Sequence, residues 1–121
     1  MEKINPEDAK SLVDRLGPSL GCDFTYEPVF PKTRKDVCAV RRLAENGTTY
    51  GFDTIYLVWR AGKELNHEHL TNSRDTKDYI FINEVLEDGS DIVVKVRSGG
   101  SYSGSAWKNE YRKSKKSLGL K

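Results

Sequence analysis

The sequence predicts an α+β fold, in which an antiparallel sheet of about five strands is covered by an N-terminal helix and followed by a short C-terminal helix. Two hairpin signals favour the sheet, because β-rich runs are joined by the turn dipeptides Asn46-Gly47 and Asp88-Gly89. An apolar stripe at helical spacing near the N-terminus predicts the covering helix. The 121 residues suit one domain, 1–121, without a repeat or domain linker. A small β-barrel is the alternative architecture.

The first element is a helix that begins at Pro6, with Asn5 as its N-terminal cap. Gly17-Pro18 ends it. One face of the helix is apolar, which indicates that it packs against the sheet. That face is formed by Ala9, Leu12, Val13 and Leu16.

A strand follows from Asp23 to Phe30, where aromatic and polar residues alternate. Pro28 and Pro31 interrupt the row of backbone N–H donors. Because an interior strand needs those donors on both sides, this strand is predicted to lie at an edge.

The first predicted hairpin joins Asp36–Glu45 to Thr48–Arg60. Residues 55–59 are apolar on both faces, so the second of these strands is predicted to lie inside the sheet. A two-residue turn at Asn46-Gly47 sets the register. It places Leu43 opposite Tyr50, Arg41 opposite Phe52 and Val37 opposite Tyr56.

The second predicted hairpin spans Tyr79–Arg97 and puts most branched residues on one face. Its two-residue turn places Val85 opposite Ile92, Asn83 opposite Val94 and Phe81 opposite Val96. Two carboxylates fall on otherwise apolar strands, Asp53 and Glu84. We expect them to face solvent or to pair with Arg42 and Lys95 respectively.

The connection Ala61–Asp78 is long for a small domain and contains both histidines of the chain. A short helical turn at Lys63–Leu70 is compatible with its two leucines. If the segment is extended, His67 and His69 project to the same side, and Asp75 is a candidate third ligand. This pattern supports a metal-dependent β-fold protein as an alternative function, although no cofactor is otherwise indicated.

Residues 98–121 form a Gly/Ser-rich connection followed by a basic C-terminal segment. Trp107, Tyr111 and Leu118 suggest a helical stripe, with Ser105 as cap and Gly119 as the end of the helix. The Gly/Ser-rich part is either a flexible linker or an anion-binding loop near Arg97 and Lys108.

Charge is unevenly distributed along the chain. Residues 106–121 contain six basic side chains and one acidic side chain, which gives a net charge of +5. The first 105 residues contain fourteen basic and seventeen acidic side chains, a net charge of −3. A basic segment attached to a mildly acidic body indicates a polyanionic partner.

No catalytic triad, carboxylate pair or dinucleotide-binding fingerprint can be assembled from the residue spacing, which favours a non-enzymatic protein. The charged start of the chain and the absence of a long apolar run predict a cytoplasmic protein without membrane contact. Cys22 and Cys38 are therefore expected to be thiols.

These observations predict a binding module that engages nucleic acid or an acidic protein surface through its basic C-terminal segment. A protein-interaction or inhibitory protein that binds through the edge strand Phe24–Phe30 is a further alternative. The candidate anion-binding residues are Arg97, Tyr102, Trp107, Lys108, Tyr111, Arg112, Lys113, Lys115 and Lys116.

Overall fold

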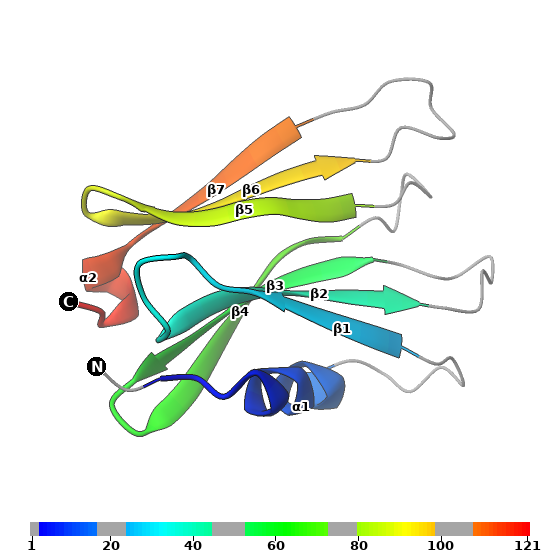
Figure 1. Ribbon diagram of the computed structural model, residues 1–121, viewed down its shortest axis with the longest axis horizontal. Helices are drawn as coiled ribbons and strands as arrows, with labels where there is room; N and C mark the ends of the chain where they lie inside the picture. The colour runs from blue at the N-terminus through cyan, green and yellow to red at the C-terminus, as the bar shows by residue number, and fades with distance from the viewer. Residues whose placement is uncertain (1–2, 17–23, 45–52, 73–79, 99–107) are drawn as a thin grey trace.

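The computed structural model describes residues 3–16, 24–44, 53–72, 80–98 and 108–121. These residues form three layers: a helix, a four-stranded sheet and a three-stranded sheet (Figure 1). The α+β class is confirmed. The strands are antiparallel to their neighbours, but they form two stacked sheets instead of the single predicted one.

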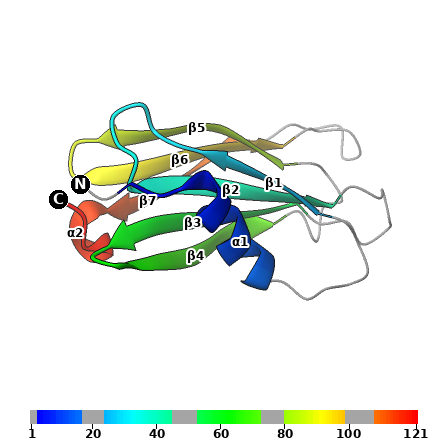
Figure 2. The ribbon, with the colours of Figure 1, turned by 60° about the horizontal axis from the view of Figure 1, so that its bottom comes forward.

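The helix α1 (Pro6–Leu16) covers the outer face of the four-stranded sheet (Figure 2). The backbone N–H of Glu7 donates to the Asn5 side-chain oxygen at 2.9 Å, so the predicted cap is present. Ala9 and Val13 are fully buried in a cluster with Val40 and Val58 of the sheet. The predicted helix, its start and its packing role are thus confirmed.

The four-stranded sheet has the strand order β1-β2-β3-β4. Its strands are β1 (Phe24–Val29), β2 (Val37–Ala44), β3 (Thr54–Ala61) and β4 (Glu64–Asn72). The edge position of β1 and the interior position of β3 agree with the predictions. Ile55 and Leu57 of β3 face the second sheet, whereas Tyr56 and Val58 face α1, which explains why this strand is apolar on both sides.

The three-stranded sheet contains β5 (Ile80–Asp88), β6 (Asp91–Ser98) and β7 (Lys108–Ser114), in that order. Its inner face carries Val85, Ile92, Val94 and Val96, which pack against the four-stranded sheet. The short helix α2 (Lys115–Leu118) follows β7 and adds Leu118 to this core, so it closes one end of the sandwich. Among the described strands each sheet keeps two edges, and neither closes into the alternative barrel.

Both predicted hairpin registers are wrong. In the first hairpin β2 ends at Ala44 and β3 begins at Thr54, with Arg42 opposite Thr54 and Val37 opposite Trp59. The predicted register placed Val37 opposite Tyr56. The predicted turn at Asn46-Gly47 lies outside the described residues.

In the second hairpin Asp88 pairs with Asp91, so the loop is Gly89-Ser90, with Gly89 at a φ of 61°. Val85 therefore lies opposite Val94 instead of Ile92. The shift is two residues, so the side chains of β6 keep their predicted face. A β-bulge between Ile82 and Glu84 turns Phe81 to the outer face.

Two strands were missed by the sequence analysis. The polar run Glu64–Asn72 is β4, joined to β3 by a tight turn at Gly62-Lys63, and the predicted helical turn is absent. Residues 108–114 form β7, and only Lys115–Leu118 are helical. The end of that helix at Gly119, with a φ of 74°, was predicted correctly, but its cap is Ser114 instead of Ser105. No helix of the described residues is long and apolar enough to cross a membrane.

Candidate functional site

The predicted basic residues fall into two groups, and the first group is paired with carboxylates of the body. Arg112 on β7 lies 2.8 Å from Asp88 and 3.5 Å from both Asp91 and Glu110. Lys113 pairs with Glu68 on β4. These contacts neutralise part of the charge of the C-terminal segment within the molecule.

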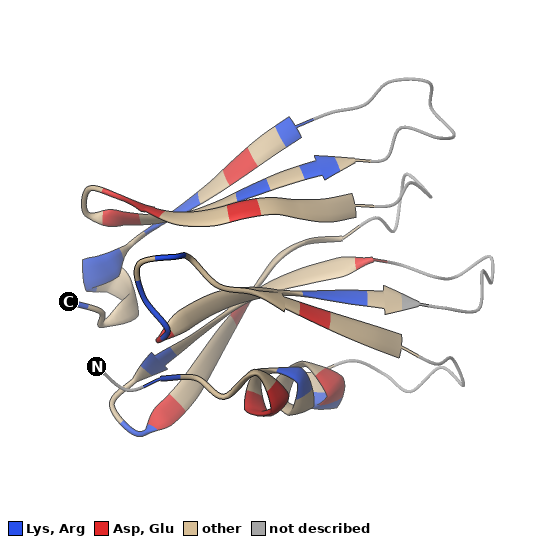
Figure 3. Cartoon of the chain, viewed as in Figure 1, with Lys and Arg blue, Asp and Glu red and all other residues tan. Residues whose placement is uncertain are grey.

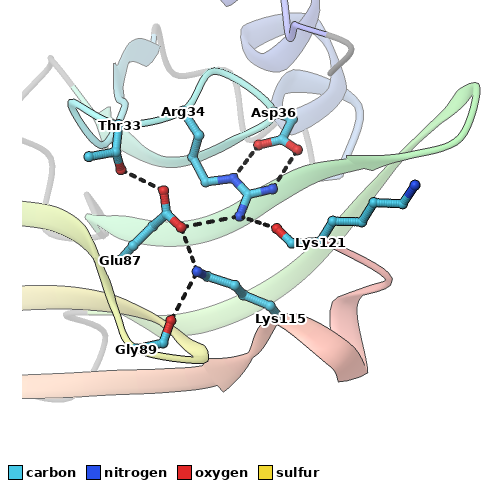
Figure 4. A network of polar contacts seen from close by, with 7 residues as sticks. All are labelled: Thr33, Arg34, Asp36, Glu87, Gly89, Lys115 and Lys121. Carbon is cyan, nitrogen blue, oxygen red and sulfur yellow. Dashed lines mark hydrogen bonds and ion pairs between the residues drawn. The ribbon is translucent and has the colours of Figure 1, made fainter.

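Lys115 belongs to a polar network that ties α2 to the turn before β2 (Figure 4). Its ammonium lies 2.5 Å from Glu87 and donates to the Gly89 carbonyl at 2.9 Å. The Thr33 hydroxyl donates to Glu87 at 2.6 Å. The hydrogen bond from Lys115, followed by that from Thr33, lowers the pKa of Glu87 below its usual value.

Arg34 forms the other half of this network. Its guanidinium donates twice to Asp36, at 2.6 and 2.8 Å, and once to the Lys121 carbonyl at 3.0 Å. The hydrogen bonds to Asp36 raise the pKa of Arg34. Because these partners come from widely separated parts of the chain, the network holds the C-terminal residues against the body.

The second group, Arg97 and Lys108, lies on the outer face of the three-stranded sheet, where the two residues are opposite each other on β6 and β7. Both side chains are exposed, and neither has a carboxylate within 4 Å among the residues that the structure describes. Figure 3 shows basic residues toward this end of β6 and β7 and acidic residues at the β5–β6 hairpin. Glu84 and Glu110 flank Lys95 on the same face, so the cations without a carboxylate partner, Arg97 and Lys108, occupy its end.

The position of Arg97 is fixed by two neighbours on β5. Its Nε donates to the side-chain oxygen of Asn83 at 2.8 Å. Its guanidinium carbon lies 4.5 Å from the centre of the Phe81 ring. Both contacts restrict the rotamers of a side chain that is otherwise long and mobile.

The same Phe81 ring contacts a second guanidinium, that of Arg41, at 4.4 Å. Arg41 is only 5% exposed and donates to Asp53 at 3.0 Å and to Glu27 at 3.2 Å. Asp53 also accepts a hydrogen bond from the backbone N–H of Ile80, the first residue of β5. A buried ion pair thus anchors the start of β5 beside the exposed Arg97.

Lys95 adds a third cation to this face, with Glu84 3.8 Å away across the strands. A hollow of about 570 Å³ lies beside it, lined by Asn83, Lys95, Val96, Lys108, Asn109 and Glu110. A second hollow of about 390 Å³ shares Asn83 and Lys95 with the first and extends to Phe30 and Lys32. The carboxylate of Glu110 lies 3.5 Å from the Arg112 Nε, which partly neutralises the acidic residue of the lining.

The other predicted aromatic and basic residues are placed as follows. Tyr111 is partly buried and packs against the core between the sheets. Lys116 is exposed on α2, which follows the end of β7 that is remote from Lys108. Tyr102 and Trp107 lie outside the described residues.

His67 and His69 lie on the same face of β4, as the extended pattern predicted, because they pair with Val58 and Tyr56 of β3. Tyr56 contacts the His69 ring edge to face at 5.6 Å. Glu68 points to the opposite face, where it pairs with Lys113. The described residues contain no group of three or more potential metal ligands, and Asp75 lies outside them.

The two carboxylates singled out in the sequence have different environments. Glu84 pairs with Lys95, as expected. Asp53 is 2% exposed and pairs with Arg41 instead of the predicted Arg42. Cys38 is a buried free thiol, and burial raises its pKa to about 12.

Three residues of this outer face, Phe81, Asn83 and Lys95, were not among the predicted site residues. The alternation of Lys95 and Arg97 with Val94 and Val96 was a visible signal for Lys95. The roles of Phe81 and Asn83 depend on the bulge in β5, which has no clear sequence signature. No protein-family model, curated protein or solved structure matches the chain.

Proposed function

We propose that this protein is a binding module that engages nucleic acid through the outer face of its three-stranded sheet. The observation that supports this proposal is the group Lys95, Arg97 and Lys108, which project from adjacent strands on one face. Arg97 and Lys108 have no carboxylate within 4 Å among the described residues, whereas Lys95 has Glu84 at 3.8 Å. Cations that are not neutralised by neighbouring acids attract phosphates and release the counterions condensed on the nucleic acid. The proposed interface is therefore formed by β6 and β7 and does not include the C-terminal helix α2.

The surroundings of these cations are consistent with a nucleotide-sized ligand. The hollow beside Lys95 is lined by Asn83, whose side-chain oxygen accepts from Arg97 and whose NH₂ group can donate to a ligand. The second hollow extends from Asn83 and Lys95 to Lys32, and Glu84 is also part of its lining.

The C-terminal cations contribute less to this proposal than the sequence suggested. Arg112, Lys113 and Lys115 each have a carboxylate partner within the molecule. A phosphate would have to compete with those partners, and the fold would lose contacts that hold β7 and α2. The proposed interface therefore retains Arg97 and Lys108 of the predicted set and adds Lys95.

The test is fluorescence anisotropy with single-stranded and duplex oligonucleotides at several salt concentrations. The double variant Arg97→Gln/Lys108→Gln should weaken binding at least about tenfold and reduce the slope of log affinity against log salt by about 1.4 to 1.8, as expected for two lost phosphate contacts. The matched control Lys63→Gln/Lys116→Gln removes the same charge from exposed sites elsewhere.

The control should change the affinity by less than about twofold, since only distant, screened charges are lost. Equal losses in both double variants would show that only net charge matters. No measurable binding of the unmodified protein to either probe at low salt would refute the proposed function.

A further inference from the structure

Arg97 is held in a single orientation although its side chain is exposed. Its Nε–H donates to the Asn83 side-chain oxygen, and its guanidinium carbon lies over the Phe81 ring, 4.5 Å from the ring centre. Among the described residues, no acceptor is bound to either terminal nitrogen of Arg97. The two terminal N–H groups, which point away from Nε, are therefore available to a ligand.

The neighbours that orient Arg97 are themselves fixed. Phe81 lies between Arg97 and Arg41, whose charge is held by the buried carboxylate of Asp53. Asn83 stands at the bulge of β5, where the register skips from Ile82 to Glu84. The bulge gives Asn83 no partner on β6 in the register, and its side chain instead reaches Arg97.

This arrangement is what bidentate recognition of a phosphate requires. A guanidinium presents two parallel N–H donors that match two oxygens of a phosphate group, whereas an ammonium acts as a point charge. Binding is stronger when the donor side chain is already ordered, because less conformational entropy is lost on association. Lys108, opposite Arg97 on β7, can contact a neighbouring phosphate of the same backbone.

We propose that Arg97 is a bidentate clamp for a backbone phosphate, and that Asn83 and Phe81 are positioning residues that hold its guanidinium. This inference rests on the proposed function, because it identifies which chemical group of the nucleic acid is bound at the Arg97 end of the interface. The same chemistry would also accept free phosphate, so the test includes both ligands.

The decisive variant is Arg97→Lys, which keeps the charge but removes the paired donors. Its affinity for a single-stranded oligonucleotide should fall about tenfold or more. The matched control Lys116→Arg also keeps the charge, at an exposed site outside the interface, and should leave the affinity within about threefold. Asn83→Ala should weaken binding about three- to tenfold while the urea midpoint stays unchanged, because Asn83 is exposed.

A spectroscopic readout separates clamping from a purely structural role. In NMR spectra of the arginine side chains, the oligonucleotide should slow rotation of the Arg97 guanidinium and resolve its terminal N–H signals, and Arg97 alone should respond in this way. Inorganic phosphate should produce the same change only at much higher concentration if the natural ligand is a nucleic acid. An equal or tighter response to inorganic phosphate would assign the clamp to free phosphate.

The two proposals fail in different ways. If Arg97→Lys binds as tightly as the unmodified protein while Arg97→Gln/Lys108→Gln loses affinity, the clamp is overturned and the nucleic-acid interface stands. If the unmodified protein binds neither oligonucleotide nor phosphate, both proposals are wrong. If Asn83→Ala has full affinity and an unchanged Arg97 spectrum, Asn83 is not a positioning residue.

Discussion

Arg41 brings a positive charge into the space between the two sheets, where water is largely excluded. It is 5% exposed, and its main partner Asp53 is 2% exposed. Moving both charges out of water costs free energy. The hydrogen bonds and the charge attraction within the pair offset this cost. Asp53 receives a further hydrogen bond from the Ile80 backbone, which links this pair to the start of β5.

Replacing Asp53 with Asn should destabilise the protein by about 3–5 kcal/mol, because it removes the buried carboxylate and leaves Arg41 with only the half-exposed Glu27. Urea denaturation followed by circular dichroism measures this free energy of unfolding. Glu27→Gln is the matched control, since Glu27 bonds to the same guanidinium but its side chain is 51% exposed. The control should cost less than about 1 kcal/mol, and a similar loss for both variants would argue against the special role of Asp53.

The partner of Asp53 could not be derived from the sequence because it depends on the strand register. The predicted two-residue turn gave β2 and β3 the wrong relative alignment, by an odd number of residues. An odd shift exchanges the faces of one strand relative to the other, so Arg41 instead of Arg42 shares a face with Asp53. Glu84 was assigned its correct partner, because Lys95 remains across the strands from it in the observed register.

At the scale of single elements, β7 shows why helical spacing alone is an ambiguous signal. Tyr111 and Leu118 fit a helical stripe, but Tyr111 also alternates with the exposed residues Glu110 and Arg112. Pairing of seven residues with β6 satisfies the backbone groups on one side of each strand. This gain, which the local sequence does not display, outweighs a modest helix propensity. The polar strand β4 was missed for the same reason.

The network around Glu87 predicts a specific dependence of stability on pH. Lys115 and Thr33 lower the pKa of Glu87 from its ordinary value of 4.5. The folded protein therefore keeps this carboxylate ionised at pH values where the unfolded chain already binds a proton. Its contribution is fully present above about pH 5 and is lost as the pH falls below 4.5 toward the lower folded pKa.

Glu87→Gln should accordingly lower the free energy of unfolding by about 1.5–3 kcal/mol near neutral pH, and the difference from the unmodified protein should shrink toward about pH 3. Thermal or urea unfolding at a series of pH values gives both quantities. Glu84→Gln, whose side chain is 58% exposed, is the control and should change stability by less than about 0.5 kcal/mol. A constant difference at all pH values would exclude Glu87 as the titrating group.

At the scale of the whole molecule, the C-terminal residues are part of the fold and not a separate appendage. Leu118 and Leu120 are buried in the core between the sheets, and Lys121 accepts a hydrogen bond from Arg34 through its carbonyl. The asymmetry of charge along the sequence is real, but folding brings much of the basic segment next to acids of β4 and β5.

Truncation after Gly104 should therefore abolish cooperative unfolding, because it removes β7 and α2 and exposes the apolar residues that they cover. Circular dichroism melting curves test this expectation. The full-length variant Lys116→Gln, which changes charge at an exposed site, should melt within about 2 °C of the unmodified protein. A cooperative transition in the truncated chain would show that residues 105–121 are dispensable for folding.

The sequence was sufficient for the features that depend on local patterns: α1 with its cap, the edge position of β1, the interior position of β3 and the apolar inner face of β6. It was insufficient for the two-sheet arrangement. The strands β4 and β7 are polar and lack the apolar alternation that predicts a strand, so the sequence does not indicate which strands form each sheet. In the candidate site, Arg97 and Lys108 were identified from charge, whereas Phe81 and Asn83 acquire their positions only through the bulge in β5.

The central claim is that the outer face of the three-stranded sheet binds nucleic acid. The most direct measurement is a titration of the isotope-labelled protein with a single-stranded oligonucleotide, followed by NMR chemical shifts. If this face is the interface, the largest shift changes will occur at Asn83, Lys95, Arg97 and Lys108, with smaller changes at Lys32. Changes concentrated on Lys113, Lys115 and Lys116, or no changes at low salt, would contradict it.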